Sequence, residues 1–304
     1  MVRLTLSVPP YRLTALPPYR PTALPPPLPA LYPLPMQPVN QTAFYCAGVR
    51  ALDAERSHPI VGDRYAHLFL GEDGKAVFER FRHLSRPNGS NIARARIVDD
   101  LLRRRLLEDA ARPIVLLGAG FDSRAYRLKG GHWLELDAAP LIARKDATLP
   151  VTRCPNPLER VAVDFSPASL REALERFRGA GKVTVVIEGV LMYLTPAQKD
   201  QLLEVLRKAL PRHEVLCDLM RERFLRRYSA EIHRVLEELG ARFEGVEPDP
   251  AARFLEAGYV LRGKTSIVLR AAELRAVEVS PFMIRWLAPG LRDGYAIHEF
   301  ERGG

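Results

Sequence analysis

A short apolar run followed at once by two glycines constrains the fold of this chain more than any other feature. Ile114–Leu117 reads Ile-Val-Leu-Leu and is followed by Gly118, Ala119 and Gly120. An apolar run of this length bounded by glycine is typical of a parallel strand that is buried on both faces. The glycines allow a tight turn and a close approach of the backbone to a ligand. The segment therefore predicts a strand, a turn and a ligand-binding loop.

A second short apolar strand ends in a carboxylate at Asp137. In nucleotide-binding α/β folds, an acid at this position hydrogen-bonds a ribose. The third glycine expected around a dinucleotide pyrophosphate is absent, because position 123 is Ser. A cofactor with a ribose but no phosphates is therefore favoured, namely S-adenosylmethionine. Two plainer interpretations stay open: the glycines form an ordinary turn, and Asp137 caps a helix that starts at Ala138.

Strand and helix patterns alternate after residue 113. Short apolar runs predict strands, and apolar residues at three- and four-residue steps predict helices. The expected strands are Ile114–Leu117, His132–Asp137, Arg160–Asp164, Val183–Glu188, Glu214–Leu219, Tyr259–Leu269 and Tyr295–Glu301. The expected helices are Ala139–Ala147, Pro167–Phe177, Pro196–Leu210, Arg223–Leu239 and Pro250–Ala257. This alternation predicts a doubly wound, Rossmann-like α/β sheet that is mostly parallel, with an antiparallel C-terminal strand.

The segment before the first strand has helical periodicity only. Its expected helices are Thr42–Arg56, Asp63–Leu70, Lys75–Leu84 and Ile92–Leu107. Asn88, Ser90 and Asn91 are good capping residues and are expected to start the last of them. Three domains result: a Pro-rich tail at 1–36, an N-terminal helical lid at 37–112, and a ligand-binding catalytic domain at 113–304 with a helical insertion at about 220–257.

The tail contains an internal repeat. Pro9–Leu16 (PPYRLTAL) recurs as Pro17–Leu24 (PPYRPTAL). Such sequence favours extended polyproline II and cannot form a helix or a central strand. It is interpreted as a disordered, dispensable tail or as upstream sequence translated in error, with Met36 as the true start; a ligand for an SH3- or WW-like partner is the alternative.

Four motifs occur in order: Gly-Ala-Gly-Phe-Asp-Ser-Arg at 118–124, Glu-Leu-Asp at 135–137, Val-Asp-Phe at 163–165, and Glu-Gly-Val-Leu-Met-Tyr-Leu at 188–194. Together they resemble the leucine carboxyl methyltransferase-like family of class I S-adenosylmethionine-dependent enzymes, in particular its bacterial O-methyltransferase branch. The resemblance runs from about Gln41 to the C-terminus. It implies S-adenosylmethionine as cofactor and transfer of a methyl group to a carboxylate or hydroxyl oxygen of a small molecule or a peptide terminus.

The resemblance also implies roles for residues at the strand ends. Asp137 matches the acid that binds both ribose hydroxyls, and Asp164 the residue near the adenine amino group, with Phe165 packing on the adenine face. Glu188 matches the acid near the methionine end, where a carboxylate suits an ammonium group. The alternative for Asp164 is a cap for the helix at Pro167, and Asp122 and Arg124 are expected at least to order the glycine loop.

Arginine and tyrosine residues complete the expected site. Arg94 aligns with the family arginine that contacts the cofactor carboxylate and lies near the acceptor, and a guanidinium group suits that role. Arg96 is interpreted as a surface residue, and a small shift in the alignment would exchange the roles of Arg94 and Arg96. Arg50 corresponds to a basic residue of the family's lid. Tyr193 matches the tyrosine that faces the acceptor; the alternative is a half-buried core phenol.

A carboxylate acceptor is favoured over a hydroxyl, because an acid with a pKa of about 4 is ionised and needs no general base. No histidine maps to the expected site. His132 and His213 begin strands, on the far side from the strand ends, and the seven histidines show no metal-type spacing. No metal is therefore expected.

Composition restricts the class of protein and the functions that the chain can have. The chain is 47% hydrophobic and 27% charged, as in globular proteins, and has no apolar run of about 20 residues. Neither a membrane span nor a signal peptide is expected, and three widely separated cysteines (Cys46, Cys154, Cys217) suggest a reduced cytoplasm. The net charge of +9 suggests nucleic-acid binding as a function. The basic runs at 103–105 and 221–227, however, lie beside acids, which is typical of solvated helix faces. The competing functions are a nicotinamide-dependent oxidoreductase and a non-catalytic nucleotide- or RNA-binding module.

Overall fold

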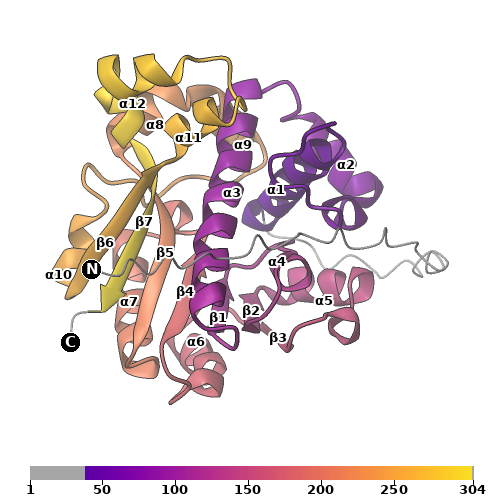
Figure 1. Cartoon of the computed structure of the whole chain (residues 1–304), viewed down its shortest axis with the longest axis vertical. Coiled ribbons are helices and arrows are strands. Elements are labelled where there is room, and N and C mark those ends of the chain that lie inside the picture. The colour runs from indigo at the N-terminus through magenta and orange to yellow at the C-terminus, as the bar shows by residue number, and fades with distance from the viewer. Residues whose placement is uncertain (1–37, 303–304) are drawn as a thin grey trace, which may run out of the picture. The chain divides into compact units, whose positions relative to one another are not determined.

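The computed structural model describes residues 38–302, and its centre is a seven-stranded sheet (Figure 1). The strand order is β3-β2-β1-β4-β5-β7-β6. Strands β1 to β5 pair in parallel, and β7 is antiparallel to both of its neighbours. The strands are β1 Pro113–Leu117, β2 His132–Asp137, β3 Leu158–Ala162, β4 Val183–Ile187, β5 His213–Met220, β6 Tyr259–Ser266 and β7 Tyr295–Arg302.

Strand order reverses beside β1, which pairs with β2 on one side and β4 on the other. In open α/β sheets this reversal opens a crevice at the carboxyl ends of the strands, where ligands bind. All five residues of β1 are buried, as the apolar run predicts. The carboxyl ends of β1, β2 and β4 therefore meet at one edge of the sheet.

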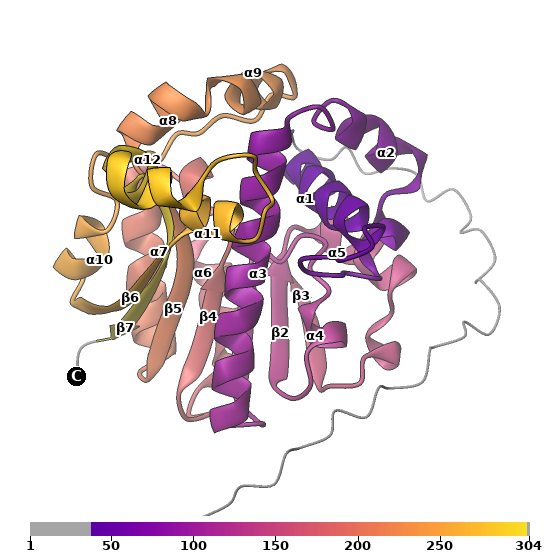
Figure 2. The ribbon, with the colours of Figure 1, turned by 45° about the horizontal axis from the view of Figure 1, so that its top comes forward.

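Helices cover both faces of the sheet. The α-helices are α1 Pro38–Ala54, α2 Gly71–Glu79, α3 Ser85–Glu108, α4 Arg124–Arg127, α5 Ala139–Thr148, α6 Pro167–Leu174, α7 Pro196–Ala209, α8 Glu222–Tyr228, α9 Ala230–Glu238, α10 Ala252–Glu256, α11 Ile267–Glu273 and α12 Pro289–Asp293. Helices α3 and α11 contribute to the core cluster on one face, and α6, α7 and α10 to the cluster on the other. Figure 2 shows α8 and α9 at the upper end of the sheet in this view, with α1 on the other side of α3 from α8.

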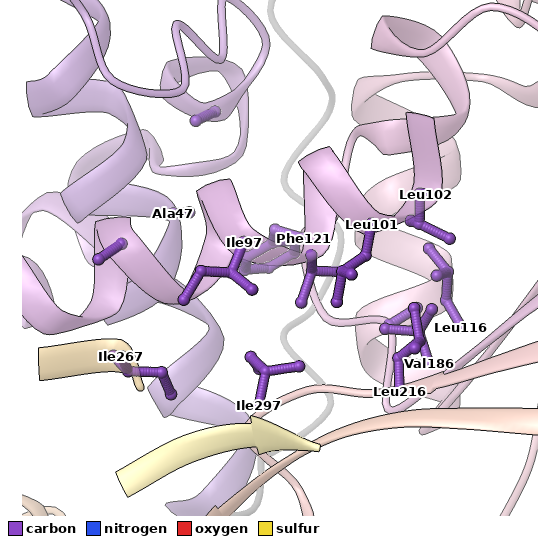
Figure 3. Close-up of a cluster of buried hydrophobic side chains, with 14 of the residues drawn as sticks. Ala47, Ile97, Leu101, Leu102, Leu116, Phe121, Val186, Leu216, Ile267 and Ile297 are labelled. Atoms are coloured by element: carbon purple, nitrogen blue, oxygen red, sulfur yellow. The ribbon is translucent and has the colours of Figure 1, made fainter. Parts of the chain in front are cut away.

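The core beneath α3 joins segments that are distant in the sequence. Figure 3 shows Ile97 and Leu101 of α3 above Leu116, Val186 and Leu216 from three neighbouring strands. These side chains are at most 4% exposed. Successive strand residues point to opposite faces, so the alternate residues of the same strands form the second core with α6 and α7. The buried side of α3 thereby packs against the sheet around Ile97 and Leu101.

The predicted doubly wound fold is confirmed, including the antiparallel C-terminal strand. The five expected parallel strands and the three helices between them agree with the structure to within about two residues, apart from the end of the helix at 167–177, which is α6 followed by a 3-10 turn. The predicted tail at 1–36 lies outside the described residues.

Several expected boundaries were wrong. The helix expected at 223–239 is two helices, which meet at the buried Ser229 in a non-helical conformation. The strand expected to reach Leu269 ends at Ser266, whose hydroxyl caps α11 by accepting from the Leu269 N–H. Local apolar spacing does not distinguish a strand from the short buried helix that follows it.

The N-terminal helices also differ in detail. Helix α3 begins at Ser85, so Asn88, Ser90 and Asn91 lie inside it and do not cap it as predicted. The segment 63–70 forms only a 3-10 turn at Ala66–Phe69. The helix expected at 75–84 is α2, which starts earlier, at Gly71, and ends earlier, at Glu79. Tertiary contacts override weak local propensity at such helix ends.

Candidate functional site

A cavity of about 540 Å³ lies at the carboxyl ends of β1, β2 and β4. This volume falls in the range of small-ligand sites. We call it the strand-end cavity. Every predicted site residue lines it: Arg50, Arg94, Gly118, Ala119, Gly120, Asp137, Asp164, Phe165, Glu188 and Tyr193. The structure therefore brings together residues from α1, α3 and the ends of four strands.

The glycine turn after β1 requires its glycines. Gly118 and Gly120 have φ angles of 71° and 46°, in the left-handed region that favours glycine. A Cβ atom on Gly118 would lie 2.3 Å from Cγ2 of Val190. At Gly118 and Gly120 the turn therefore presents only backbone atoms to the cavity.

Asp137 joins the glycine turn to the second strand end. Its Oδ2 accepts a hydrogen bond from the Gly120 N–H at 2.5 Å, and its Oδ1 accepts one from the Ala138 N–H at 2.7 Å. Burial raises the pKa of Asp137, against the effect of these two N–H donors. A carboxylate has about four acceptor positions, so two remain for a ligand. The capping and ligand-binding interpretations of Asp137 are therefore compatible.

Asp164 and Phe165 lie just after β3. The Oδ1 of Asp164 accepts from the Ser166 N–H, and it is Ser166 that caps α6 by accepting from the Ser169 N–H. Asp164 is therefore not the helix cap. Phe165 has a φ of 59°, a conformation that side-chain-bearing residues adopt at a cost and that clusters at functional sites.

Glu188 is held between two buried arginines. Its Oε1 accepts from Nε of Arg94 at 3.0 Å, and its Oε2 lies 2.8 Å from Nη1 of Arg124. Burial would raise the pKa of Glu188, but Arg124 and Arg94 hold it below its ordinary value. Oε2 makes no well-formed hydrogen bond to any described residue. The cavity thus has an ionised carboxylate with acceptor capacity left.

Most N–H groups of Arg94 donate hydrogen bonds to other groups of the protein. Nε donates to Glu188, and Nη1 donates to Asp218 at 3.1 Å and to the Tyr295 hydroxyl at 2.9 Å. Nη2 has only the sulfur of Cys46, at 3.6 Å. Burial works to lower the pKa of Arg94, but these neighbours keep it well above its ordinary value. The guanidinium stays charged, with Nη2 as its least engaged nitrogen.

Arg96 does not line the strand-end cavity. It pairs with Asp100 at 2.8 Å and donates to the carbonyl of Ile60 at 2.8 Å. Of these two arginines, α3 therefore presents Arg94 to the strand-end cavity.

Arg50 ties α1 to the loop after β1. Its Nε pairs with Asp63 at 2.9 Å, and its Nη2 donates to the Phe121 carbonyl at 2.7 Å. The hydroxyl of Ser123 also donates to Asp63, at 2.7 Å. The side chain that replaces a third glycine is thus occupied in holding the N-terminal helices to the glycine loop.

Sequence reasoning missed two buried acids that pair with Arg94 and Arg124 behind the cavity lining. Asp218 accepts from the Gly189 N–H at 2.7 Å and from the Tyr295 hydroxyl at 2.7 Å. Its place near the carboxyl end of β5 is the signal that could have found it. Asp99 was expected on a solvated face, but it is fully buried and pairs with Arg124 at 2.6 Å and Arg127 at 2.7 Å.

The solvated-face interpretation also fails for Arg105, which is largely buried and pairs with Glu214 and Glu299 at 2.5 and 2.9 Å. It holds for Arg103, Arg104 and the arginines at 221–227, which are exposed. A helix that packs against a sheet can therefore carry charges on its inner face when acids from the strands meet them.

A sequence model of the leucine carboxyl methyltransferase family matches residues 43–207, more than half of the chain. The chain belongs to this family. It is 35% identical over 184 residues to a Mycolicibacterium smegmatis protein named "Putative S-adenosyl-L-methionine-dependent methyltransferase", covering 54% of this chain and 61% of that protein. The chain thus spans about three-fifths of the length of this relative.

Two solved structures have a similar fold. A DUF574 family protein from Streptomyces avermitilis matches with a TM-score of 0.54 and 13% identity, over 83% of this chain and 100% of that one. A protein described as a "putative methyltransferase" from Thermobifida fusca matches with a TM-score of 0.51 and 16% identity, over 78% and 92%. At such identities the likeness concerns the fold alone.

A second cavity, of about 440 Å³, adjoins the first, and much of it lies outside the family match. We call it the helical cavity. It shares Thr42, Cys46, Arg94, Gly189 and Tyr193 with the strand-end cavity. Its further lining residues are Tyr45, Arg86, Pro87, Ser90, Asn91, Met192, Met220, Phe224, Arg227, Tyr228, Ser229, Ile232, Leu236, Phe243, Val268, Val277, Val279, Leu291 and Tyr295.

Histidines take no part in either cavity. His213 contacts the carbonyl of Leu210 and the hydroxyl of Tyr259, and burial lowers its pKa to about 4. Within residues 38–302, no group of three or more His, Cys, Asp or Glu side chains is arranged to hold a metal ion. Over the same range, no helix combines the length and the apolar character that a membrane crossing needs.

Proposed function

We propose that this chain is an S-adenosylmethionine-dependent O-methyltransferase that acts on a carboxylate oxygen. The observation that carries the proposal is the strand-end cavity, in which the Gly118–Gly120 turn, Asp137 and the ionised Glu188 face the same space. The name of the M. smegmatis relative supports the same cofactor. A hydroxyl acceptor is the less favoured form of the proposal.

The side chains of the strand-end cavity suit the polar groups of S-adenosylmethionine. In this proposal Asp137 accepts from the ribose hydroxyls, and Glu188 accepts from the ammonium group. Phe165 packs on the adenine and Asp164 accepts from its amino group. Arg94 faces the cofactor carboxylate through Nη2.

The shared wall of the two cavities is where the two substrates would meet. When bound, S-adenosylmethionine supplies an electrophilic methyl group: an acceptor oxygen forms the new O–C bond while the C–S bond breaks and its electron pair stays on sulfur. Burial raises the pKa of Tyr193 well above neutrality, so this phenol is a hydrogen-bond donor and not a base. A carboxylate is nucleophilic without proton removal, which suits a wall without histidine.

Exclusion of water would favour this step, because the acceptor carboxylate loses its charge. We extend the proposal to α1, which lines both cavities through Thr42 and Cys46, as the lid over the shared wall. The bonds of Arg50 and Ser123 to Asp63 are the contacts that would keep it closed.

Mass spectrometry of the protein as purified, followed by titration calorimetry, tests the proposal. We expect bound S-adenosylmethionine or S-adenosylhomocysteine, and saturable binding of S-adenosylhomocysteine with no comparable binding of NAD. Preferential binding of NAD would favour an oxidoreductase and overturn the proposal. Binding of RNA with no binding of either nucleoside would point to a nucleic-acid module. Transfer of an isotope-labelled methyl group to oxygen of a carboxylic acid, in base-labile linkage, tests the finer claim.

A further inference from the structure

We propose that the helical cavity binds a small, mainly apolar acid with two anionic groups, one at each end. The inner group is the methyl acceptor at the shared wall, and the outer group is held by Arg86 and Arg227. The inference rests on the proposed methyltransferase function and adds the chemical class of the acceptor.

The lining of the helical cavity is apolar apart from arginine and neutral polar groups. Aliphatic and aromatic side chains from α8, α9, α11 and the segment 277–291 form much of it, and Met192 and Met220 add sulfur-containing side chains. Three arginines line it, whereas none of its described lining residues is Asp, Glu, Lys or His. A body of apolar contacts with a few positive groups selects an apolar molecule that carries negative charge.

The three arginines of the cavity lining differ in burial. Arg94 is 7% exposed and belongs to the shared wall, whereas Arg86 and Arg227 are exposed. Arg86 and Arg94 are eight residues apart on α3, which is about 12 Å along the helix axis. Pro87, Ser90 and Asn91 line the cavity between them. One face of α3 therefore runs the length of the cavity from the outer charge to the inner one.

The outer arginines lack acidic partners. Neither Arg86 nor Arg227 forms an ion pair with any described residue, and Arg227 only lies over the ring of Tyr228, at 5.6 Å. Their charge is thus available to a ligand, because a guanidinium group binds a carboxylate or phosphate through charge-assisted hydrogen bonds.

The inner end has a buried polar atom without a partner. The Tyr45 hydroxyl makes no hydrogen bond to any described residue, although Tyr45 is only 5% exposed. Such a group costs about 1–3 kcal/mol unless it finds a partner. It lines the helical cavity near Arg94, Cys46 and Tyr193. An acceptor carboxylate beside the shared wall would supply the missing acceptor.

A matched series of ligands tests the inference in the full chain saturated with S-adenosylhomocysteine. Decanedioate, decanoate and decanol share an apolar chain and differ in having two, one or no anionic groups. By calorimetry, below micelle-forming concentrations, we expect decanedioate to bind most tightly and decanol most weakly. In the Arg86→Ala/Arg227→Ala variant, decanedioate affinity should fall at least tenfold, to about that of decanoate, with decanoate and S-adenosylhomocysteine binding changed less than threefold.

The Arg82→Ala/Arg223→Ala variant is the control, because it removes two exposed arginines from the same two regions without touching the cavity lining. It should bind all three ligands like the unmodified chain. Equal binding of diacid and monoacid, equal losses in both double variants, or no binding of either acid would overturn the inference. Failure to bind S-adenosylhomocysteine would instead contradict the proposed function, and repeating the series without it would still test the cavity.

Discussion

The two cavities of this chain share a wall but are built differently. The strand-end cavity is formed mainly by strand ends, a glycine turn and buried ion pairs, and its carboxylates are already held by donors. The helical cavity is formed mainly by helices, and none of its described lining residues is an acid. The first presents fixed charges of both signs, and the second presents apolar surface with arginine.

This difference follows in part the division of the chain into a range that matches the family and a range beyond it. The family match at 43–207 includes every predicted residue of the strand-end cavity. Beyond the match, residues from Met220 onward supply much of the helical cavity, but only Gly240, Ala241, Arg242 and Glu244 of the strand-end cavity. Binding of a common cofactor would require the first set, and choice of the acceptor would depend on the second. The following predictions test that separation.

The largest expected effect is on stability, from Arg124→Met. Arg124 is 3% exposed and pairs with Asp99 and Glu188 at 2.6 and 2.8 Å, as well as with Asp122. Removing one member of a buried ionic network leaves its partners uncompensated, and we expect a loss of about 3–5 kcal/mol in the free energy of unfolding. Denaturant titration measures it. Arg104→Met, at an exposed position of α3, should change it by less than about 0.5 kcal/mol.

The strand-end cavity could be predicted from sequence because its signals are local. Gly118, Asp137 and Glu188 each come directly after, or at the end of, a short apolar strand, and parallel strand ends meet at one edge. Asp99 could not be found in this way, because its burial depends on Arg124 and Arg127 arriving from beyond β1.

Of the helical cavity, only the helical insertion at about 220–257, expected to shape the acceptor pocket, was predicted, and the rest was missed for the same reason. This cavity requires one face of α3 to meet α8, α9 and the segment 277–291, more than a hundred residues away. Helical periodicity shows that a helix has an apolar face but not which partner covers it. The break at Ser229 and the turn into α11 after Ser266 were missed as well, and both shape this cavity.

Arg94→Lys should have the largest effect on turnover, since Arg94 belongs to both cavities. Lysine keeps the charge but cannot replace the separate bonds to Glu188, Asp218 and Tyr295. We expect weaker cofactor binding and a further loss of rate, of about 100-fold in all, because a small misplacement of reacting groups is costly. Kinetics with an identified acceptor measure both. Arg96→Lys is the matched control, and an equal or larger effect there would contradict the role given to Arg94.

Asp137→Ala should weaken cofactor binding without affecting the helical cavity. Loss of hydrogen bonds to the ribose should cost about 1–3 kcal/mol in the binding free energy of S-adenosylhomocysteine. Calorimetry measures this, with a melting curve to show that the turn at Gly120 survives. Asp146→Ala, at an exposed carboxylate of α5, should bind normally. Unchanged affinity in Asp137→Ala would remove this carboxylate from the cofactor site.

Acid should lower the free energy of unfolding through protonation of Asp99, which pairs with the arginines behind the strand-end cavity. Burial would raise the pKa of Asp99, but Arg124 and Arg127 lower it to about 2. A lowered pKa means that the stabilisation is present above the unfolded pKa of about 4 and is lost as the pH falls toward 2, by about 2 kcal/mol. The stability difference between the unmodified chain and Asp99→Asn should therefore shrink from pH 6 to pH 2. A difference independent of pH would show that Asp99 is not held ionised.

The smallest expected effect on stability is at Tyr45→Phe, where only the helical cavity should respond. Because the hydroxyl of Tyr45 is buried with no partner among the described residues, its removal should leave the free energy of unfolding unchanged or raise it by less than about 1 kcal/mol. Cofactor affinity should also be unchanged, since Tyr45 lines only the helical cavity. Affinity for the monoacid decanoate should fall, because the hydroxyl is a donor for the inner carboxylate. Tyr228→Phe, at an exposed ring of the same cavity, is the control. Loss of stability in Tyr45→Phe would mean that the hydroxyl already has a partner, and an unchanged decanoate affinity would mean that the inner anionic group lies elsewhere.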